Sequence, residues 1–261
     1  MEKKKDQFVA VCADRRVDAE RLLPLVKPLA ASLRKSIILF TCSPDGDHWV
    51  ESLGVPFAAM KSDWPTVVEA MPTAFNIVLA VTLVDSGASR GTSTHPRQIL
   101  KNFRNSKIAY LVLPNGIEHL ATQCVALTLD HQRESKEKLL WATYFQRFCG
   151  SHVTVYHYPY TDLAFRQRLD NNIRYLEKIF SSLKLVYNLQ PLPPGNQFAN
   201  PDLKALVLPG IDLFISLVPD RRDRDLFDFF SPPEPLRLLR KARERAVLFL
   251  NQRDDLYIMC D

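Results

Sequence analysis

The chain has 261 residues, a net charge of +5 and a hydrophobic content of 46% beside 24% charged residues. This is the composition of a folded globular protein, and it excludes an intrinsically disordered chain. No apolar run reaches the roughly 18 residues of a membrane-spanning helix, and the short run after Lys3–Lys5 predicts no signal peptide.

The cysteine, glycine and charge patterns narrow the class further. The five cysteines are odd in number and form no C-x-x-C motif, so we expect reduced thiols and a cytoplasmic protein. Only eight glycines stand against 18 prolines, which restricts any loop that needs several glycines. The small basic excess is not the concentrated basic face of a nucleic-acid-binding protein. We therefore expect neither nucleic acid nor membrane as a partner.

The first half of the chain alternates predicted strands and helices. Strands are predicted at 8–13, 36–41, 55–60, 76–83 and 107–113, and helices at 17–34, 63–74 and 95–105. Asp63 or Ser62 is expected to cap the second helix, and Thr94 the third, with Pro96 in its first turn.

The second half repeats this pattern. Strands are predicted at 123–129, 151–157, 183–189, 211–217 and 246–251, and helices at 134–149, 161–181, 201–208 and 234–245. The segment 189–198, with three prolines and a glycine, is a predicted loop.

The two halves also share residues at a fixed offset. Gln7–Asp14 resembles Gln123–Asp130, an offset of 116 that persists to the second strand of each half without a gap. The longer loop in the second half raises the offset to 136 at the fourth strand. Two copies of one unit therefore predict two domains, at residues 1–117 and 118–261.

Strands that are apolar on both faces and separated by helices predict an α/β fold. Each domain should hold a doubly wound, five-stranded parallel sheet with right-handed crossovers. Ligands of such sheets bind beyond the carboxyl ends of the strands, where the strand order reverses. Asp14 and Asp130 follow the first strand of each domain and are expected there.

At these residues the chain resembles a tandem universal stress protein over essentially its whole length. Val125–Asp130 and Glu134–Ala142 are similar to the family's opening strand, Asp and first helix. Asp212–Val218 looks like its fourth strand, and Leu236–Arg240 followed by Ala246–Leu250 looks like its last helix and strand. The resemblance implies Rossmann-like domains of the adenine nucleotide alpha hydrolase-like type that form an internal pseudo-dimer.

The resemblance also implies a nucleotide site. Family members with nucleotide activity bind ATP or AMP, with the strand-one Asp at the adenine and a G-x-x-G-x(9)-G-S/T loop around the phosphates. Backbone N–H groups and a capped helix N-terminus favour phosphate there. The corresponding positions are Ala13, Asp14, Phe40, Thr41, Gly87, Gly91, Ser93 and Thr94 in the first domain, and Asp130 in the second.

Both phosphate loops depart from the family pattern. The first keeps Gly87 and Gly91, four residues apart, and has Ser93-Thr94 where Gly-Ser is expected. The second has no glycine and places Pro232-Pro233 there, and proline has no N–H to donate. We expect the second domain not to bind ATP in the family manner. In the alternative interpretation, Asp14 and Asp130 only cap the loops or helices that follow them.

The sequence predicts a non-enzymatic, regulatory stress-response protein with degenerate ATP-binding loops, no catalytic residue and no required cofactor. A protein partner or self-association is expected, with a homodimer left open. One alternative is an adenine-nucleotide sensor that binds ATP or AMP in the first domain. Another is a serine hydrolase, since Gly87–Gly91 matches G-x-S-x-G at Ser89, and Asp130 and His152 or His157 follow in chain order.

Three further segments carry weaker signals. Asp45–His48 offers metal-ligand side chains but no second cluster, so a turn without a metal site is predicted. Leu226–Phe230 places four large apolar residues in a predicted loop, where they are expected to cover the crevice or contact a partner. The tail 254–261 is predicted to add an edge strand.

Overall fold

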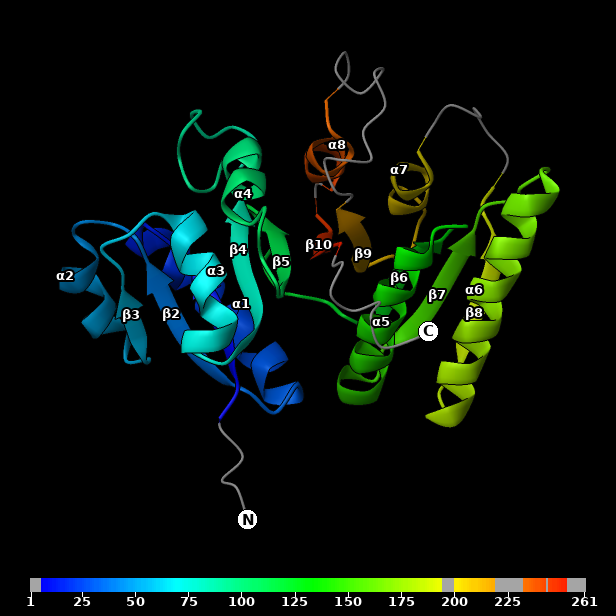
Figure 1. The fold of residues 1–261 in the computed structure, drawn as a ribbon. Helices are drawn as coiled ribbons and strands as arrows, with labels where there is room; N and C mark the ends of the chain where they lie inside the picture. The colour runs from blue at the N-terminus through cyan, green and yellow to red at the C-terminus, as the bar shows by residue number, and fades with distance from the viewer. Residues whose placement is uncertain (1–5, 194–199, 219–231, 243, 253–261) are drawn as a thin grey trace. The chain divides into compact units, whose positions relative to one another are not determined.

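The structure is a computed structural model that describes residues 6–193, 200–218, 232–242 and 244–252 (Figure 1). The chain divides into two compact units, Met1–Leu120 and Ala121–Asp261, whereas the repeat in the sequence places the boundary after residue 117. The expected apolar cover at Leu226–Phe230 and the expected edge strand at 254–261 lie outside the described residues.

The first unit is a parallel sheet with helices between its strands. In chain order its elements are β1 (Phe8–Cys12), α1 (Arg16–Ser32), β2 (Ser36–Thr41), α2 (Gly46–Val50), the 3-10 helix η1 (Glu51–Leu53), β3 (Phe57–Ala59), α3 (Trp64–Ala74), β4 (Ile77–Val84), α4 (Pro96–Asn102) and β5 (Ala109–Pro114). The strand order is β3-β2-β1-β4-β5, and every pair in it is parallel. The order reverses beside β1, so the carboxyl ends of β1 and β4 mark the switch point.

The strands of this unit are buried on both faces. Val9, Ala10 and Val11 in β1, and Leu79 and Ala80 in β4, have no exposed surface. Because successive strand residues point to opposite faces, both faces of the sheet are covered.

The second unit repeats the topology of the first. Its elements are β6 (Cys124–Leu129), η2 (Arg133–Ser135), α5 (Lys136–Cys149), β7 (His152–His157), α6 (Leu163–Ser182), β8 (Tyr187–Pro191), α7 (Pro201–Leu206), β9 (Leu213–Val218), α8 (Glu234–Lys241) and β10 (Ala246–Asn251). The strand order is β8-β7-β6-β9-β10, again all parallel. The predicted α/β fold class with doubly wound parallel strands is confirmed.

The structure differs from the predicted elements at two places. The short helices at 46–53 were not predicted, because eight residues without a helical apolar period give no signal. The strand predicted at 183–189 is β8 at Tyr187–Pro191 instead. Leu183 still belongs to the end of α6 as its C-cap, and Lys184 follows with φ 55°, so the chain turns before it extends.

The predicted cap of α3 is confirmed. Asp63 lies in extended backbone before the helix, and the Thr66 amide donates to its Oδ1 at 3.2 Å. Pro65 occupies the first turn, where its missing N–H costs nothing. Among the described residues, none of the helices is both long enough and apolar enough to pass through a bilayer.

Candidate functional site

Asp14 lies directly beyond β1, at the switch point of the first unit. Its two carboxylate oxygens accept hydrogen bonds from different parts of the same unit: the Cys42 amide donates to Oδ1 at 3.0 Å, and the Trp64 indole Nε1 donates to Oδ2 at 2.7 Å. Asp14 therefore ties the loop after β2 to the first turn of α3. Both of its oxygens are already partnered.

Trp64 is the residue at this site that the sequence analysis missed. It is the first residue of α3, and its side chain is buried with 7% exposure. A buried indole N–H nearly always has an acceptor, and here the acceptor is Asp14. A tryptophan at the start of a predicted helix was the available signal, although its partner lies 50 residues away.

Phe40 and Thr41, predicted beside the adenine, are fully buried. The Phe40 ring meets Phe75 edge to face at 5.0 Å between centroids. Thr41 Oγ1 accepts from the Ser43 amide at 3.2 Å, and its methyl group lies so close to Gly46 that a Cβ there would be 2.5 Å away. The main chain of Ala13 donates to the Phe40 carbonyl at 3.0 Å. These buried side chains are engaged in packing within the first unit.

The loop between β4 and α4 carries the four predicted phosphate-binding residues. The Gly87 amide donates to Asp85 Oδ1 at 2.9 Å, and Gly91 adopts φ +102°, a conformation that glycine reaches without strain. The Asp85 amide donates to the Thr94 carbonyl at 2.9 Å, which closes the loop at its base. The loop is thus shaped by its own hydrogen bonds, and one glycine amide is occupied.

The predicted cap of α4 is wrong. His95, and not Thr94, occupies the N-cap position, where its Nδ1 accepts from the Arg97 amide at 3.2 Å. Thr94 instead turns inward, with its hydroxyl buried and without a hydrogen-bond partner. The Thr94 carbonyl bonds to Asp85, which fixes this residue one position before the cap.

Asp130 occupies the equivalent position in the second unit but has different partners. Its Oδ1 accepts from the Gln132 amide at 2.8 Å, which forms a local turn of the kind Asp favours. Asn172 of α6 donates through Nδ2 to the carbonyls of Asp130 and Gln132, both at 2.8 Å. Asp130 therefore shapes the loop between β6 and α5, as the alternative interpretation expects.

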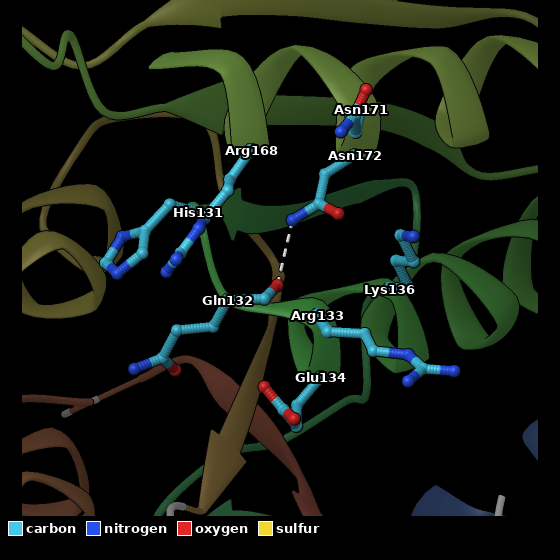
Figure 2. A pocket seen from close by; sticks show the side chains of 8 residues that line it. All are labelled: His131, Gln132, Arg133, Glu134, Lys136, Arg168, Asn171 and Asn172. Carbon is cyan, nitrogen blue, oxygen red and sulfur yellow. Dashed lines mark hydrogen bonds between the residues drawn. The ribbon is translucent and has the colours of Figure 1, made fainter. Parts of the chain in front are cut away.

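A pocket of about 400 Å³ lies beside this loop. Figure 2 shows its lining, with Arg168 and Asn172 of α6 pointing toward the loop that carries Gln132. The lining residues are His131, Gln132, Arg133, Glu134, Lys136, Arg168, Asn171 and Asn172. They are mostly polar or charged.

An aromatic cluster lies beside this pocket. The Tyr160 hydroxyl and His131 Nδ1 are 2.7 Å apart, and the His131 and Phe165 rings are 4.4 Å apart. Burial and then the charge of Asp130 raise the pKa of Tyr160 to about 12. This phenol therefore stays protonated at neutral pH and serves as a hydrogen-bonding group.

Four buried polar side chains form a cluster in the second unit, two of them on the neighbouring strands β6 and β9. The sequence did not predict this cluster. Lys138 donates to Thr128 Oγ1 at 3.1 Å, Thr128 bonds to Asp202 Oδ1, and Ser216 donates to Asp202 Oδ2 at 2.5 Å. All four side chains are buried. Lys138 precedes Ala142 by four positions on the buried face of α5, which was the available signal.

The start of α8 differs from the phosphate-binding loop that the family resemblance implies. Pro233 is the N-cap residue and makes no side-chain capping bond, and Pro232 precedes it. Burial, and then the charge of Asp202, raise the pKa of Glu234 in the first turn to about 8. Because proline has no N–H to donate, this helix start does not favour phosphate.

The geometry around Ser89 lacks the parts of a hydrolase. Ser89 is exposed, and α4 begins only at Pro96, whereas a nucleophile elbow turns directly into its helix. Within the described ranges no histidine bonds to its hydroxyl, although nucleophilic activation needs a base within reach.

Cysteine side chains and metal-ligand side chains are the other candidates for catalytic chemistry. Burial, and then the charges of Asp14 and Asp63, raise the pKa of the Cys42 thiol to about 12, so it is not a thiolate at neutral pH. In the part of the chain that the structure describes, no group of three or more His, Cys, Asp or Glu side chains is placed to hold a metal ion. Asp45 instead precedes the short helix α2.

No protein-family model matches the sequence, and no curated protein matches it. Solved structures do match over most of the chain. A universal stress protein from Archaeoglobus fulgidus DSM 4304 has a TM-score of 0.61 at 11% identity, covering 95% of this chain and 97% of its own.

Two Pseudomonas aeruginosa structures are similarly alike. One is a candidate universal stress protein from strain UCBPP-PA14, with a TM-score of 0.58, 12% identity, and 96% and 94% coverage. The other, from strain PAO1, is of unknown function, with a TM-score of 0.57, 12% identity, and 96% and 93% coverage. The fold of this chain is therefore the mixed α/β fold of universal stress proteins, with parallel strands and intervening helices.

Proposed function

We propose that the chain is a tandem universal stress protein that regulates a stress response through protein partners and has lost family-type nucleotide binding. The repeated strand order of the two units and the coverage of 95% of the chain support the tandem assignment. In this proposal the two domains form an internal pseudo-dimer, with self-association beyond it left open.

The observation that supports this proposal most directly is the hydrogen bonding of the Asp14 carboxylate. In the family resemblance this carboxylate faces adenine, but here Trp64 and the Cys42 amide take both of its oxygens. A nucleotide would have to share the Asp14 oxygens with these two donors or displace one of them. Displacing a part-buried donor costs about 1–3 kcal/mol, which weakens binding about 5- to 150-fold.

The second domain supports the same conclusion independently. The Asp130 carboxylate accepts from the Gln132 amide, and Pro232-Pro233 removes N–H donors before α8. We therefore assign Asp130 a structural role and expect no family-type nucleotide site in the second domain.

The groups that could perform turnover support a non-enzymatic role. The Cys42 thiol stays protonated at neutral pH, and Ser89 lies on a loop without a bonded histidine. Cys12, Cys42, Cys124 and Cys149 are free thiols, which suits a reducing compartment, and we place the protein in the cytoplasm.

Isothermal titration calorimetry of the full chain with ATP and AMP tests the proposal. We expect neither nucleotide to show micromolar binding that Asp14→Asn abolishes, which separates this site from any anion site elsewhere on the chain. Micromolar binding that is lost in Asp14→Asn would overturn the proposal and establish the nucleotide sensor of the first domain.

The nucleotide sensor remains the second candidate, and one observation favours it. Gly91 keeps a left-handed conformation in the loop after β4, and the buried Thr94 hydroxyl nearby has no partner. In that function, Ala13 and Asp14 would contact the base, and Gly87, Gly91, Ser93 and Thr94 would contact the phosphates. The calorimetric experiment decides between the two.

A further inference from the structure

A groove with a cationic lining lies between α7 and α8 of the second unit. Its volume is about 430 Å³, within the range of small-molecule sites. The lining residues are Asn200, Leu203, Lys204, Val207, Arg237, Arg240 and Lys241. Four of these seven carry a positive charge, and none is acidic.

The spacing of the cations on the helices explains why they converge. Arg237 and Lys241 are four positions apart on α8, and Arg240 lies three positions after Arg237, so all three share one side of the helix. Lys204 follows Leu203 on α7. The Leu203 side chain supplies part of the apolar floor of the groove.

Two acids of the described residues, Asp202 and Glu234, lie near these charges. Among the described residues, none of the four cations forms an ion pair. The Asp202 carboxylate, under the first turn of α7, is occupied by Thr128 and Ser216. Glu234 faces Asp202, Lys138 and Arg237, and its pKa of about 8 keeps it largely neutral at pH 7. The groove therefore has a net positive charge at neutral pH.

One buried donor in the groove has no partner among the described residues. Arg237 Nε finds no hydrogen-bond acceptor there, although its guanidinium lies on the groove lining. A buried unsatisfied donor is costly, and an oxyanion at this position would remove that cost. Arginine also presents several N–H groups in a fixed fork that matches phosphate oxygens.

We propose that the groove between α7 and α8 binds a small anion that carries several phosphoryl groups. Four converging cations suit more than one negative charge, and α8 has only eight residues, about 12 Å in length. That span fits a few linked phosphates, whereas a nucleic acid would require a longer basic face. The proposal is independent of the nucleotide site at Asp14.

Calorimetry of the full chain with sodium tripolyphosphate as the probe tests this site. We expect saturable binding of one probe per chain in the wild type, and weaker binding of sulfate at equal ionic strength. Arg240→Gln/Lys241→Gln changes two exposed side chains and should weaken binding at least tenfold. Arg174→Gln/Lys178→Gln on α6 removes the same charge from exposed positions and should leave binding within twofold of the wild type.

Arg237→Lys provides a second variant that keeps the charge but removes the Nε fork. We expect it to weaken tripolyphosphate binding without lowering the thermal midpoint of the circular dichroism signal. Absence of saturable binding in the wild type would overturn the proposal. Equal losses in the α8 and α6 double variants would also overturn it, because they would show attraction by net charge alone.

Discussion

At the scale of single residues, the bond from Trp64 to Asp14 has a measurable effect on stability. Trp64→Phe keeps an aromatic ring in the buried site but removes the indole N–H that Asp14 Oδ2 accepts at 2.7 Å. We expect the free energy of unfolding to fall by about 1–3 kcal/mol, because a part-buried carboxylate oxygen loses its donor. Urea denaturation followed by circular dichroism measures this change.

Trp141→Phe is the matched control for that variant. Trp141 contacts Tyr144 and Phe145 through its ring, and its indole N–H has no hydrogen bond to any residue that the structure describes. Its substitution should cost less than Trp64→Phe. Equal losses in the two variants would contradict the stabilising role of the Asp14 bond.

Gly46 gives a second prediction at this scale. A Cβ at Gly46 would lie 2.5 Å from the Thr41 methyl group, whereas a Cβ at Gly87 meets nothing closer than 3.4 Å. Gly46→Ala should therefore lower the free energy of unfolding by about 1–3 kcal/mol through overpacking. Gly87→Ala should change it by much less, and similar urea midpoints for the two variants would refute this interpretation.

The roles of single residues were the part least open to prediction from the sequence. The position of Asp14 after a buried strand was visible, but its partner Trp64 lies 50 residues along the chain. Contacts of this kind depend on how a loop and a helix meet in space. The sequence likewise placed Phe40 near the crevice and could not show that Phe75 covers it.

At the scale of elements, the first turn of α8 contains a carboxyl group with an altered proton affinity. Burial and the charge of Asp202 raise the pKa of Glu234 to about 8. The charge of Lys138, a hydrogen bond with Asn200 and the charge of Arg237 act in the opposite direction and lower this pKa. The unfolded chain loses this proton near the ordinary value of 4.5. Between these two values, the folded protein holds a proton that the unfolded chain has released.

This difference makes stability depend on pH. As pH rises from about 5 to 8, the free energy of unfolding should fall by at most about 1.4 kcal/mol per pH unit from this group. Glu234→Gln has no proton to lose, so its stability should decline less over the same interval. Urea denaturation at several pH values measures the difference between the two curves.

Glu69→Gln on the exposed side of α3 is the control for this comparison. Its curve should run parallel to that of the wild type from pH 5 to 8. If the Glu234→Gln curve also runs parallel to the wild type, Glu234 does not retain its proton in the folded protein.

Elements with a clear period were predictable, whereas the short helices at 46–53 and the cap of α4 were not. The buried strands and the longer helices appear where the apolar pattern places them, because period and burial act over many residues. The start of α4 depends on whether Thr94 or His95 accepts from an amide, and either side chain is able to do so. Asp85 decides it by bonding to the Thr94 carbonyl.

At the scale of the whole molecule, the repeat in the sequence predicted the repeated topology. The offset of 116 between Gln7–Asp14 and Gln123–Asp130 corresponds to β1 and β6, and each is the strand beside which the order reverses. Sequence self-similarity carried this information because both halves keep the same buried strands. The basic groove between α7 and α8 was not predictable, because its cations come from separate segments.

The proposed loss of nucleotide binding predicts the state of the purified protein. Full-length chain purified from an expression host should release no more ATP, ADP or AMP than Asp14→Asn when both are denatured with acid. Anion-exchange chromatography of the supernatant, compared with the protein concentration, measures this. Release of about one nucleotide per chain from the wild type, and none from Asp14→Asn, would contradict the proposed function.

The position of Trp64 has a practical consequence for spectroscopy. It is one of three tryptophans, and its indole is both buried and bonded to the Asp14 carboxylate beyond the end of β1. Its fluorescence emission should shift to longer wavelength when α3 separates from the end of β1. The protein thus contains an intrinsic reporter of that separation, and single-tryptophan variants would isolate its signal.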